Sequence, residues 1–276
     1  MTRSGEAVSV VVAAHNEADH IGRLIRTLSE QTVVPDEIVV VDDGSRDATA
    51  SIATSLGATV VRTTQKGPAM ARNLGVRRAA GDIIVFLDGD MSVDARFIED
   101  LTLPIRTQGV SGTFTREIYL GNPENSWAVA YGRIRRLGSR RLLPDSFPDH
   151  WENFRAVRRD CFLACGGYDN VGYGEDMTLA PKLGELAVAA VGAKCFHFSP
   201  SSLHEIAENG RWIGRGHDIR LVPHPWRDNS WRAIRRCVVD VRRGGTWHSI
   251  PARIAYHGGV VVGLCDRKLR PGRHWK

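Results

Sequence analysis

The first hundred residues alternate short apolar runs with helix-like segments, and this alternation limits the fold more than any other feature of the sequence. Alternation of this kind is typical of βαβ units, in which parallel strands lie side by side and helices cover the sheet. The predicted strands are Val8–Ala14, Glu37–Val41, Thr59–Arg62 and Ile83–Leu87. The predicted helices between them are Ala18–Ser29, Ala48–Leu56 and Ala69–Ala79. The sequence therefore predicts an α/β fold with a mostly parallel central sheet flanked by helices.

After residue 90 the pattern is looser. It predicts a helix at Ala95–Thr107, a strand at Val110–Tyr119, and helices at Pro123–Arg136 and Leu203–Gly214. We expect one catalytic domain over residues 1–205 and a basic, Trp/Arg-rich helical extension over residues 206–276. Within the first domain we expect two parts, at residues 1–107 and residues 108–205.

Charge is divided unevenly between these two regions. Residues 1–205 contain 22 Lys and Arg against 26 Asp and Glu, whereas residues 206–276 contain 15 against 5. The extension also holds five of the seven tryptophans. This mixture favours an anionic membrane surface as a partner, the alternative being solvated charge on an ordinary helical surface. No nucleic-acid partner is expected.

The cysteines and the apolar runs bear on where the chain works. The five cysteines are odd in number and form no C-x-x-C pair, which indicates neither a disulfide framework nor a zinc finger. No apolar stretch reaches the roughly eighteen residues that a membrane span needs. We therefore expect a cytoplasmic protein, peripheral at the inner face of the membrane if the extension binds lipid.

Acidic residues follow directly after predicted strands, where ligands bind in open α/β sheets. Asp88 and Asp90 bracket Gly89 after the fourth strand, so in extended backbone their side chains point the same way. Two oxygen ligands so close together are typical of a site for Mg²⁺ or Mn²⁺ that carries substrate phosphates. The sequence therefore predicts a metal site at this strand end.

Two further segments suggest nucleotide contacts. Asp43 follows the second strand, where its carboxylate could accept a hydrogen bond from a pyrimidine imide, or could serve only in a turn. Arg72 lies one turn into the third helix, where a guanidinium and backbone N–H groups could meet a diphosphate. A plain surface arginine is the alternative for Arg72.

These segments resemble the family 2 glycosyltransferases with the GT-A fold of nucleotide-diphospho-sugar transferases. The resemblance covers about residues 8–216 and comes from several strings in family-like order and spacing. The strings are VSVVVAAHNEA (8–18), VVVDDGSRDAT (39–49), KGPAMARNLG (66–75), GDIIVFLDGD (81–90), FRAVRRDCF (154–162), GGYD (166–169) and GEDM (174–177).

The resemblance implies that residues 1–107 form the nucleotide-binding part and residues 108–205 the acceptor-side part. It also implies a set of donor contacts. Ala14 and Glu17 match the residues that embrace the nucleoside, and Asp43 matches the aspartate that reads the base. Arg72 matches a residue near the uracil or the phosphates, and Asp88 matches the contact to ribose and sugar. The string that contains His15 lacks the proline frequent in the family, which leaves the choice of nucleotide open.

The resemblance also implies the catalytic and metal-binding residues. Asp176 matches the general base that takes the proton of the acceptor hydroxyl, and Glu175 is its neighbour. Asp90 matches the metal ligand, with Mn²⁺ or Mg²⁺ as the ion. His197 is a candidate third ligand by resemblance, the alternative being a structural histidine.

The implied function is inverting transfer of a single sugar, from a UDP-sugar by default, to an acceptor hydroxyl. Residues 208–212 read ENGRW where processive synthases show QxxRW, which favours single transfer. The acceptor is unknown, and a lipid-linked or cell-envelope molecule is expected from the basic extension. The alternatives are a nucleotidyltransferase and a non-catalytic protein that binds nucleotide sugars or polyanions. The sequence makes no prediction of the oligomeric state.

Overall fold

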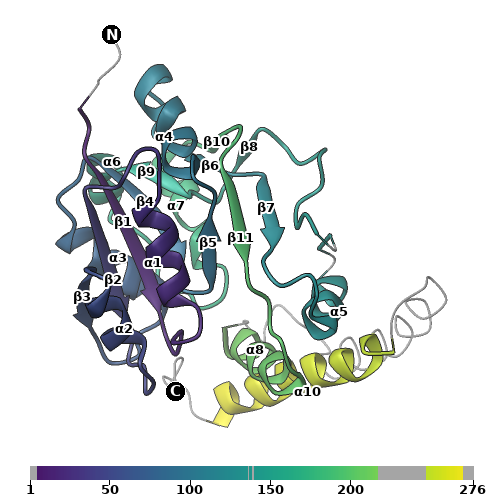
Figure 1. Cartoon of the computed structure of the whole chain (residues 1–276). Helices are drawn as coiled ribbons and strands as arrows, with labels where there is room; N and C mark the ends of the chain where they lie inside the picture. The colour runs from purple at the N-terminus through teal and green to yellow at the C-terminus, as the bar shows by residue number, and fades with distance from the viewer. Residues whose placement is uncertain (1–4, 136, 139, 217–246, 270–276) are drawn as a thin grey trace. The chain divides into compact units, whose positions relative to one another are not determined.

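The computed structural model describes residues 5–135, 137–138, 140–216 and 247–269 (Figure 1). Trp226, Trp231 and Trp275 of the predicted extension lie outside these residues.

The chain forms two compact units. The first consists of Met1–Tyr119 with Leu143–His197, and the second of Leu120–Leu142 with Phe198–Lys276. The sequence instead predicts a division after residue 205, and that division stays a prediction.

The first unit contains the main sheet. Its strands are β1 (Val8–Ala14), β2 (Glu37–Asp42), β3 (Thr59–Arg62), β4 (Ile83–Asp88), β6 (Gly112–Phe114), β8 (His150–Trp151), β9 (Ala156–Arg158) and β10 (Ala187–Ala189). They lie in the order β3-β2-β1-β4-β9-β6-β10-β8. Neighbouring strands from β3 to β4 are parallel, and β9 is antiparallel to both β4 and β6. The predicted mostly parallel sheet is therefore confirmed.

Helices cover both faces of this sheet (Figure 1). They are α1 (Ile21–Ser29), α2 (Thr49–Ser55), α3 (Pro68–Arg78), α4 (Phe97–Gln108), α6 (Arg159–Ala164) and α7 (Leu179–Leu183). Successive side chains of a strand point to opposite faces. Val10 and Val12 accordingly join the core that contains α1 and α4, while Val11 joins the core beside α3. Continuous apolar strands are the consequence of burial on both faces.

In the first unit, two predicted elements differ most from their predicted bounds. Helix α1 begins at Ile21 rather than Ala18, because the backbone N–H groups of Glu17 and Ala18 bond to Thr49 and Asp47. The strand predicted at Val110–Tyr119 is two strands, β6 and β7 (Glu117–Leu120), which belong to different sheets. The hydroxyl of Thr115 interrupts the single predicted strand, because it donates to the carbonyl of Ala193 and accepts from the N–H of Glu117.

A second sheet has the order β5-β11-β7, with β5 at Met91–Val93 and β11 at Lys194–His197. Strands β5 and β11 are antiparallel, and their register places His197 opposite Met91. This pairing carries the end of β11 to the segment that follows β4.

The second unit contains three described helices, α5 (Ser126–Ile134), α8 (Leu203–Gly216) and α10 (Ser249–Leu269). Helix α5 begins later than predicted, because Asn125 caps it by accepting from the N–H groups of Trp127 and Ala128. A small core joins the three helices through Tyr131, Ile206 and Ala252. Helix α8 confirms the predicted helix at residues 203–214.

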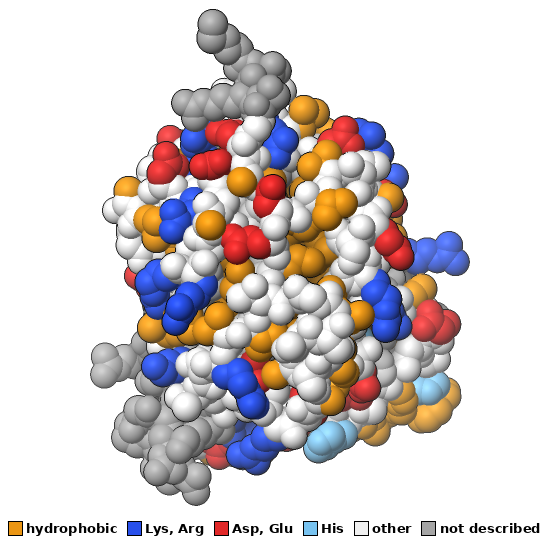
Figure 2. All heavy atoms as spheres, turned by 60° about the vertical axis from the view of Figure 1, so that its left-hand side comes forward, with side chains coloured by type: hydrophobic (Ala, Val, Ile, Leu, Met, Phe, Trp, Pro, Cys, Tyr) orange, Lys and Arg blue, Asp and Glu red, His pale blue; other side chains and the backbone are white. Residues whose placement is uncertain are grey.

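None of the helices in the described part of the chain has an apolar stretch long enough to cross a bilayer. Figure 2 shows one face of the molecule, on which basic and acidic side chains are interspersed.

Candidate functional site

The carboxyl ends of β1, β2 and β4 meet at one edge of the main sheet. The register places Ala14 opposite Asp42, and Ala13 opposite Asp88. The strand order reverses beside β1, since β2 and β3 lie on one side of it and β4 on the other. Ligands bind at such a switch point in open α/β sheets. The structure thus brings together the strand ends that the sequence singled out.

Arg72 of α3 joins two of the predicted site carboxylates. Its Nη2 donates to Oδ1 of Asp88 at 2.7 Å, and its Nη1 donates to Oε1 of Glu175 at 2.6 Å. The guanidinium is largely buried, with 11% of the side chain exposed. Arg72 therefore holds the segment after β4 and the Glu175–Asp176 pair against each other.

Charge compensation in this cluster keeps Asp88 ionised. Burial acts to raise the pKa of Asp88, but Arg72 and Arg155 outweigh burial and hold that pKa below its usual range. Arg155 contributes an Nη1 that lies 3.4 Å from Oδ2 of Asp88. Burial raises the pKa of Glu175, and Arg72 opposes this effect. In this structure both terminal nitrogens of Arg72 bond to carboxylates. The predicted contact of Arg72 with a diphosphate therefore stays a prediction.

Asp90 and His197 form a second cluster. His197 Nε2 lies 3.5 Å from Oδ2 of Asp90, because the pairing of β11 with β5 brings the histidine to this position. Oδ1 of Asp90 is buried and has no hydrogen-bond partner among the residues that the structure describes. Burial raises the pKa of Asp90, His197 counteracts this effect, and Asp88 adds to it.

The Asp90 cluster fits a divalent cation whose remaining ligands come from substrate. Within the described residues, no group of three or more His, Cys, Asp or Glu side chains could by itself hold a metal ion. Mg²⁺ in phosphate-transfer sites is held by one or two protein carboxylates together with phosphate oxygens and water. A buried carboxylate oxygen without a partner, beside an imidazole, provides such a partial site. Asp88 is less suited to bind the ion, because Arg72 and Arg155 occupy both of its oxygens.

Gly89 brings Glu17 against the segment between the two aspartates. A Cβ at Gly89 would lie 2.6 Å from Cγ of Glu17, so only glycine fits this approach. Burial raises the pKa of Glu17 to about 9, and Asp90 and Asp88 add to this effect. Glu17 therefore lies beside the predicted metal ligand, in addition to its predicted place near the nucleoside.

Asp43 organises the loop before α3. Its Oδ1 accepts from the N–H of Lys66 and its Oδ2 from the N–H of Gly67, both at 2.7 Å. Each carboxylate oxygen retains a second lone pair that could meet a base. The predicted reading of the base by Asp43 stays a prediction, and the loop contacts are an additional role that sequence reasoning missed.

His15 lies next to Asp43 in a polar group that sequence reasoning also missed. Its Nδ1 is 2.9 Å from the carbonyl oxygen of Asp43, while the side-chain amides of Asn16 and Gln65 lie 3.1 Å from its Nε2. Asn16 and Gln65 both have positive φ angles, of 58° and 32°. Strained residues of this kind cluster at ligand sites. The sequence offered only the His15-Asn16-Glu17 string as a signal.

The Glu175–Asp176 pair lies in a short 3₁₀ helix, η1 (Glu175–Met177). Glu175 is buried against Arg72, whereas the partly exposed Asp176 accepts a short hydrogen bond from the Nδ2 group of Asn153. Asn153 is a site residue that no sequence pattern indicated, apart from its place directly before the FRAVRRDCF string.

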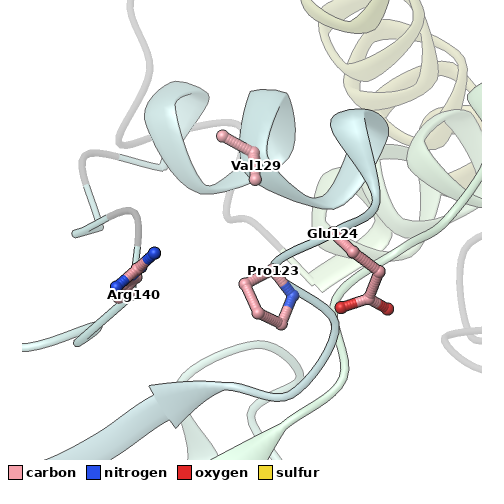
Figure 3. A pocket seen from close by; sticks show the side chains of 4 residues that line it. All are labelled: Pro123, Glu124, Val129 and Arg140. Atoms are coloured by element: carbon pink, nitrogen blue, oxygen red, sulfur yellow. The ribbon is translucent and has the colours of Figure 1, made fainter.

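Two pockets occur away from these clusters. In the second unit, a pocket of about 390 Å³ is lined by Pro123, Glu124, Val129 and Arg140 (Figure 3). In the first unit, a pocket of about 370 Å³ lies between α1 and α2. Neither is lined by the predicted catalytic or metal-binding residues.

Comparison with known proteins places this geometry in a family. The model of "Glycosyl transferase family 2" matches residues 9–165, which is more than half of the chain. Glucosyl-3-phosphoglycerate synthase of Mycolicibacterium paratuberculosis is 32% identical over 164 residues, covering 53% of this chain and 49% of that protein. Glycosyltransferase AglE of Haloferax volcanii is 33% identical over 118 residues, covering 40% and 39%. The chain thus spans about half the length of these curated relatives, or less.

Solved structures show the same fold. Staphylococcus aureus TarS 1-349 in complex with UDP-GlcNAc has a TM-score of 0.57 at 15% identity, covering 97% of this chain and 93% of that one. A Pyrobaculum calidifontis mannosyltransferase in complex with GDP-Man and Mn²⁺ has a TM-score of 0.55 at 20% identity, covering 98% and 77%.

Glucosyl-3-phosphoglycerate synthase of Mycobacterium tuberculosis, in complex with Mn²⁺, UDP and phosphoglyceric acid, has a TM-score of 0.53 at 25% identity, covering 77% of this chain and 78% of that one. These similarities confirm the GT-A fold. Because the family model matches most of the nucleotide-binding strings and more than half of the residues, this chain belongs to glycosyltransferase family 2.

Proposed function

We propose that this chain transfers a single sugar from a nucleoside-diphosphate sugar to an acceptor hydroxyl, with inversion at the anomeric carbon. The observation that carries the proposal is the bridge from Asp88 through Arg72 to Glu175. This bridge supports the proposal, because Asp176, the proposed base, directly follows Glu175, and Arg72 joins Glu175 to Asp88 of the proposed donor-binding segment.

The chemistry proceeds by one displacement. Asp176 takes the proton of the acceptor hydroxyl while the acceptor oxygen bonds to the anomeric carbon. The bond from that carbon to the diphosphate oxygen breaks at the same time, and the nucleoside diphosphate leaves with the electron pair. Asn153 orients Asp176 by its hydrogen bond during this step.

Asp90 and His197 are the residues that would hold a divalent cation, Mn²⁺ or Mg²⁺. Such an ion, when bound, neutralises charge on the leaving diphosphate. Two structural neighbours contain Mn²⁺ according to their descriptions, which supports a metal in this chain as well.

A UDP-sugar is the donor we propose first, since TarS and the mycobacterial synthase are described with UDP-GlcNAc and UDP. GDP- and dTDP-sugars follow. Ala14, Glu17 and Asp43 would contact the nucleoside, and Asp88 the ribose and the sugar.

The acceptor we propose is a lipid-linked or cell-envelope molecule. The support is the basic, Trp-rich sequence of residues 206–276. The names of two relatives, glucosyl-3-phosphoglycerate synthase and 4,4'-diaponeurosporenoate glycosyltransferase, show that acceptors differ within the family. An acceptor must therefore be found by assay.

The test is thermal unfolding with UDP, GDP, dTDP and their sugar conjugates, each with and without Mn²⁺. We expect one nucleotide to stabilise the fold, and Mn²⁺ to increase that shift. Asp90→Asn should remove the increase, while Asp160→Asn, which changes a carboxylate with 74% of its side chain exposed, should keep it. If no nucleotide stabilises the protein, the donor proposal is wrong. Release of pyrophosphate instead of a nucleoside diphosphate would identify a nucleotidyltransferase.

A further inference from the structure

Helix α10 exposes several large apolar side chains along one side. Four large apolar side chains recur every three or four residues near one line along the helix and are substantially exposed. They are Trp247 just before the helix (68% exposed), Ile250 (39%), Ile254 (66%) and Val262 (47%). Gly258 continues this line between the last two and also has open space around it. We call these four side chains the α10 stripe.

Between Ser249 and Asp266, the charged side chains of α10 are Arg253 and Asp266, and both lie away from the α10 stripe. Arg253 is 3% exposed. Asp266 accepts from Nε of Arg211 at 2.8 Å and from Nη2 of Arg215 at 2.9 Å, both on α8. A helix on the surface of a soluble domain normally has the opposite arrangement, with its charges facing water.

Glycines make the contact between α8 and α10 unusually close. A Cβ added at any of four glycines would lie 2.0–2.3 Å from a carbonyl oxygen of the opposite helix. They are Gly210 and Gly214 of α8, and Gly259 and Gly263 of α10. Pairs of small residues four apart that let helix backbones touch are frequent between helices in lipid. The two helices therefore pair through backbone, and the four side chains of the α10 stripe lie outside this contact.

Charge identifies the kind of partner. Residues 217–246, which precede α10 in the sequence, contain seven Arg and three Asp, and residues 270–276 contain two Arg, one Lys and no acidic residue. An apolar stripe on a helix flanked by basic sequence is complementary to a bilayer that carries anionic headgroups. Because none of the described helices can span the bilayer, the expected position is in the plane of the interface.

We propose that the α10 stripe inserts into the surface of an anionic lipid bilayer. Ile250, Ile254 and Val262 then lie at the boundary of headgroups and acyl chains, and Trp247 lies at headgroup level, where tryptophan is enriched. This inference concerns the second unit alone and is independent of the proposed transferase chemistry.

The test measures flotation of the full chain with vesicles of phosphatidylcholine alone, and with vesicles of phosphatidylcholine mixed with phosphatidylglycerol. We expect binding to the mixed vesicles only. The double variant Ile254→Asp/Val262→Asp should bind at least about tenfold more weakly, since withholding even one such side chain from lipid corresponds to that factor. Brominated lipid should quench the wild type more than Trp247→Phe.

The matched control is Val191→Asp, which places the same charge at an equally apolar position that is 77% exposed in the first unit. It should bind like the wild type. Circular dichroism and thermal unfolding establish that all variants are folded. If the double variant bound vesicles as strongly as the wild type, the proposal would be overturned, because basic charge alone would then explain attachment. The proposal would also be overturned if the wild type formed a dimer that bound no vesicles while the double variant stayed monomeric. A second copy of the chain would then cover the stripe.

Discussion

Arg72 and Glu175 lie 103 residues apart in the sequence and are joined by a hydrogen bond of 2.6 Å from Nη1 to Oε1. The same guanidinium bonds to Asp88 at 2.7 Å. One buried cation thus connects the segment expected to bind the donor with the turn that contains the expected base. The predictions below separate the chemical roles of this region from its contribution to stability.

Asp176→Asn should lose at least about a hundredfold in kcat, the usual contribution of a general base. Nucleotide binding should persist, because Asp176 is not among the residues expected to contact the donor. Turnover and the nucleotide-dependent thermal shift measure the two effects separately. Near-normal turnover would rule out Asp176 as the base.

Asn153→Ala should lower kcat about tenfold or more and leave the KM for the donor unchanged, because a hydrogen bond to a charged group contributes about 1.5–3 kcal/mol. Asn153→Asp should be slower still at neutral pH, since an ionised carboxylate cannot donate to Asp176 and repels it. Steady-state kinetics of both variants check this. A change confined to KM would contradict a positioning role.

Arg72→Ala should lower the free energy of unfolding by about 3 kcal/mol or more, because it leaves the buried carboxylate of Glu175 without its cation and removes the nearer of two arginines from Asp88. The control is Arg96→Ala, which also removes an arginine that bridges two carboxylates, Glu99 and Asp100, but has 57% of its side chain exposed. That control should change stability by about 1 kcal/mol or less. Urea unfolding compares the two, and equal effects would refute the importance of burial.

Gly259→Ala and Gly258→Ala should have opposite effects, although the residues are neighbours in α10. A Cβ at Gly259 would lie 2.0 Å from the carbonyl oxygen of Ala207, so this variant should destabilise the α8–α10 pair. Gly258 has open space, so alanine there should stabilise by about 0.5–1 kcal/mol through helix propensity. Limited proteolysis and thermal unfolding measure both. Similar behaviour of the two would show that the helices are not in backbone contact.

The bonds of Asp266 to Arg211 and Arg215 predict a dependence of stability on pH. These arginines hold the pKa of Asp266 below its usual value in the folded state. The stabilisation is therefore present above the ordinary pKa of about 3.9 and is lost as the pH falls through the lowered folded-state pKa. Asp266→Asn should be less stable than the wild type by about 1 kcal/mol at pH 7. The difference should shrink below about pH 4, and a constant difference across this range would contradict the prediction.

Local sequence patterns were sufficient to predict strands β1 to β4 of the nucleotide-binding part and the helices between them. Strands β1 and β3 have the bounds that the apolar runs predicted. For β1 the reason is burial on both faces, which gives a continuous apolar segment. The ends of α1 and α5 were less predictable, since the contacts of Asp47 and the cap by Asn125 depend on the exact path of each loop.

The sequence by itself determined the order of strands β1 to β4 and the helices between them, the family, and the positions of the acidic residues at the strand ends, because all of these depend on periodicity and short strings. Only the tertiary structure decided which side chains meet. Arg72 reaches Glu175, His197 reaches Asp90 through the pairing of β11 with β5, and Asn153 reaches Asp176. The outward apolar face of α10 likewise depends on which side of the helix packs on α8. Contacts of this kind join residues far apart in the chain, and packing and strand register set them rather than local sequence.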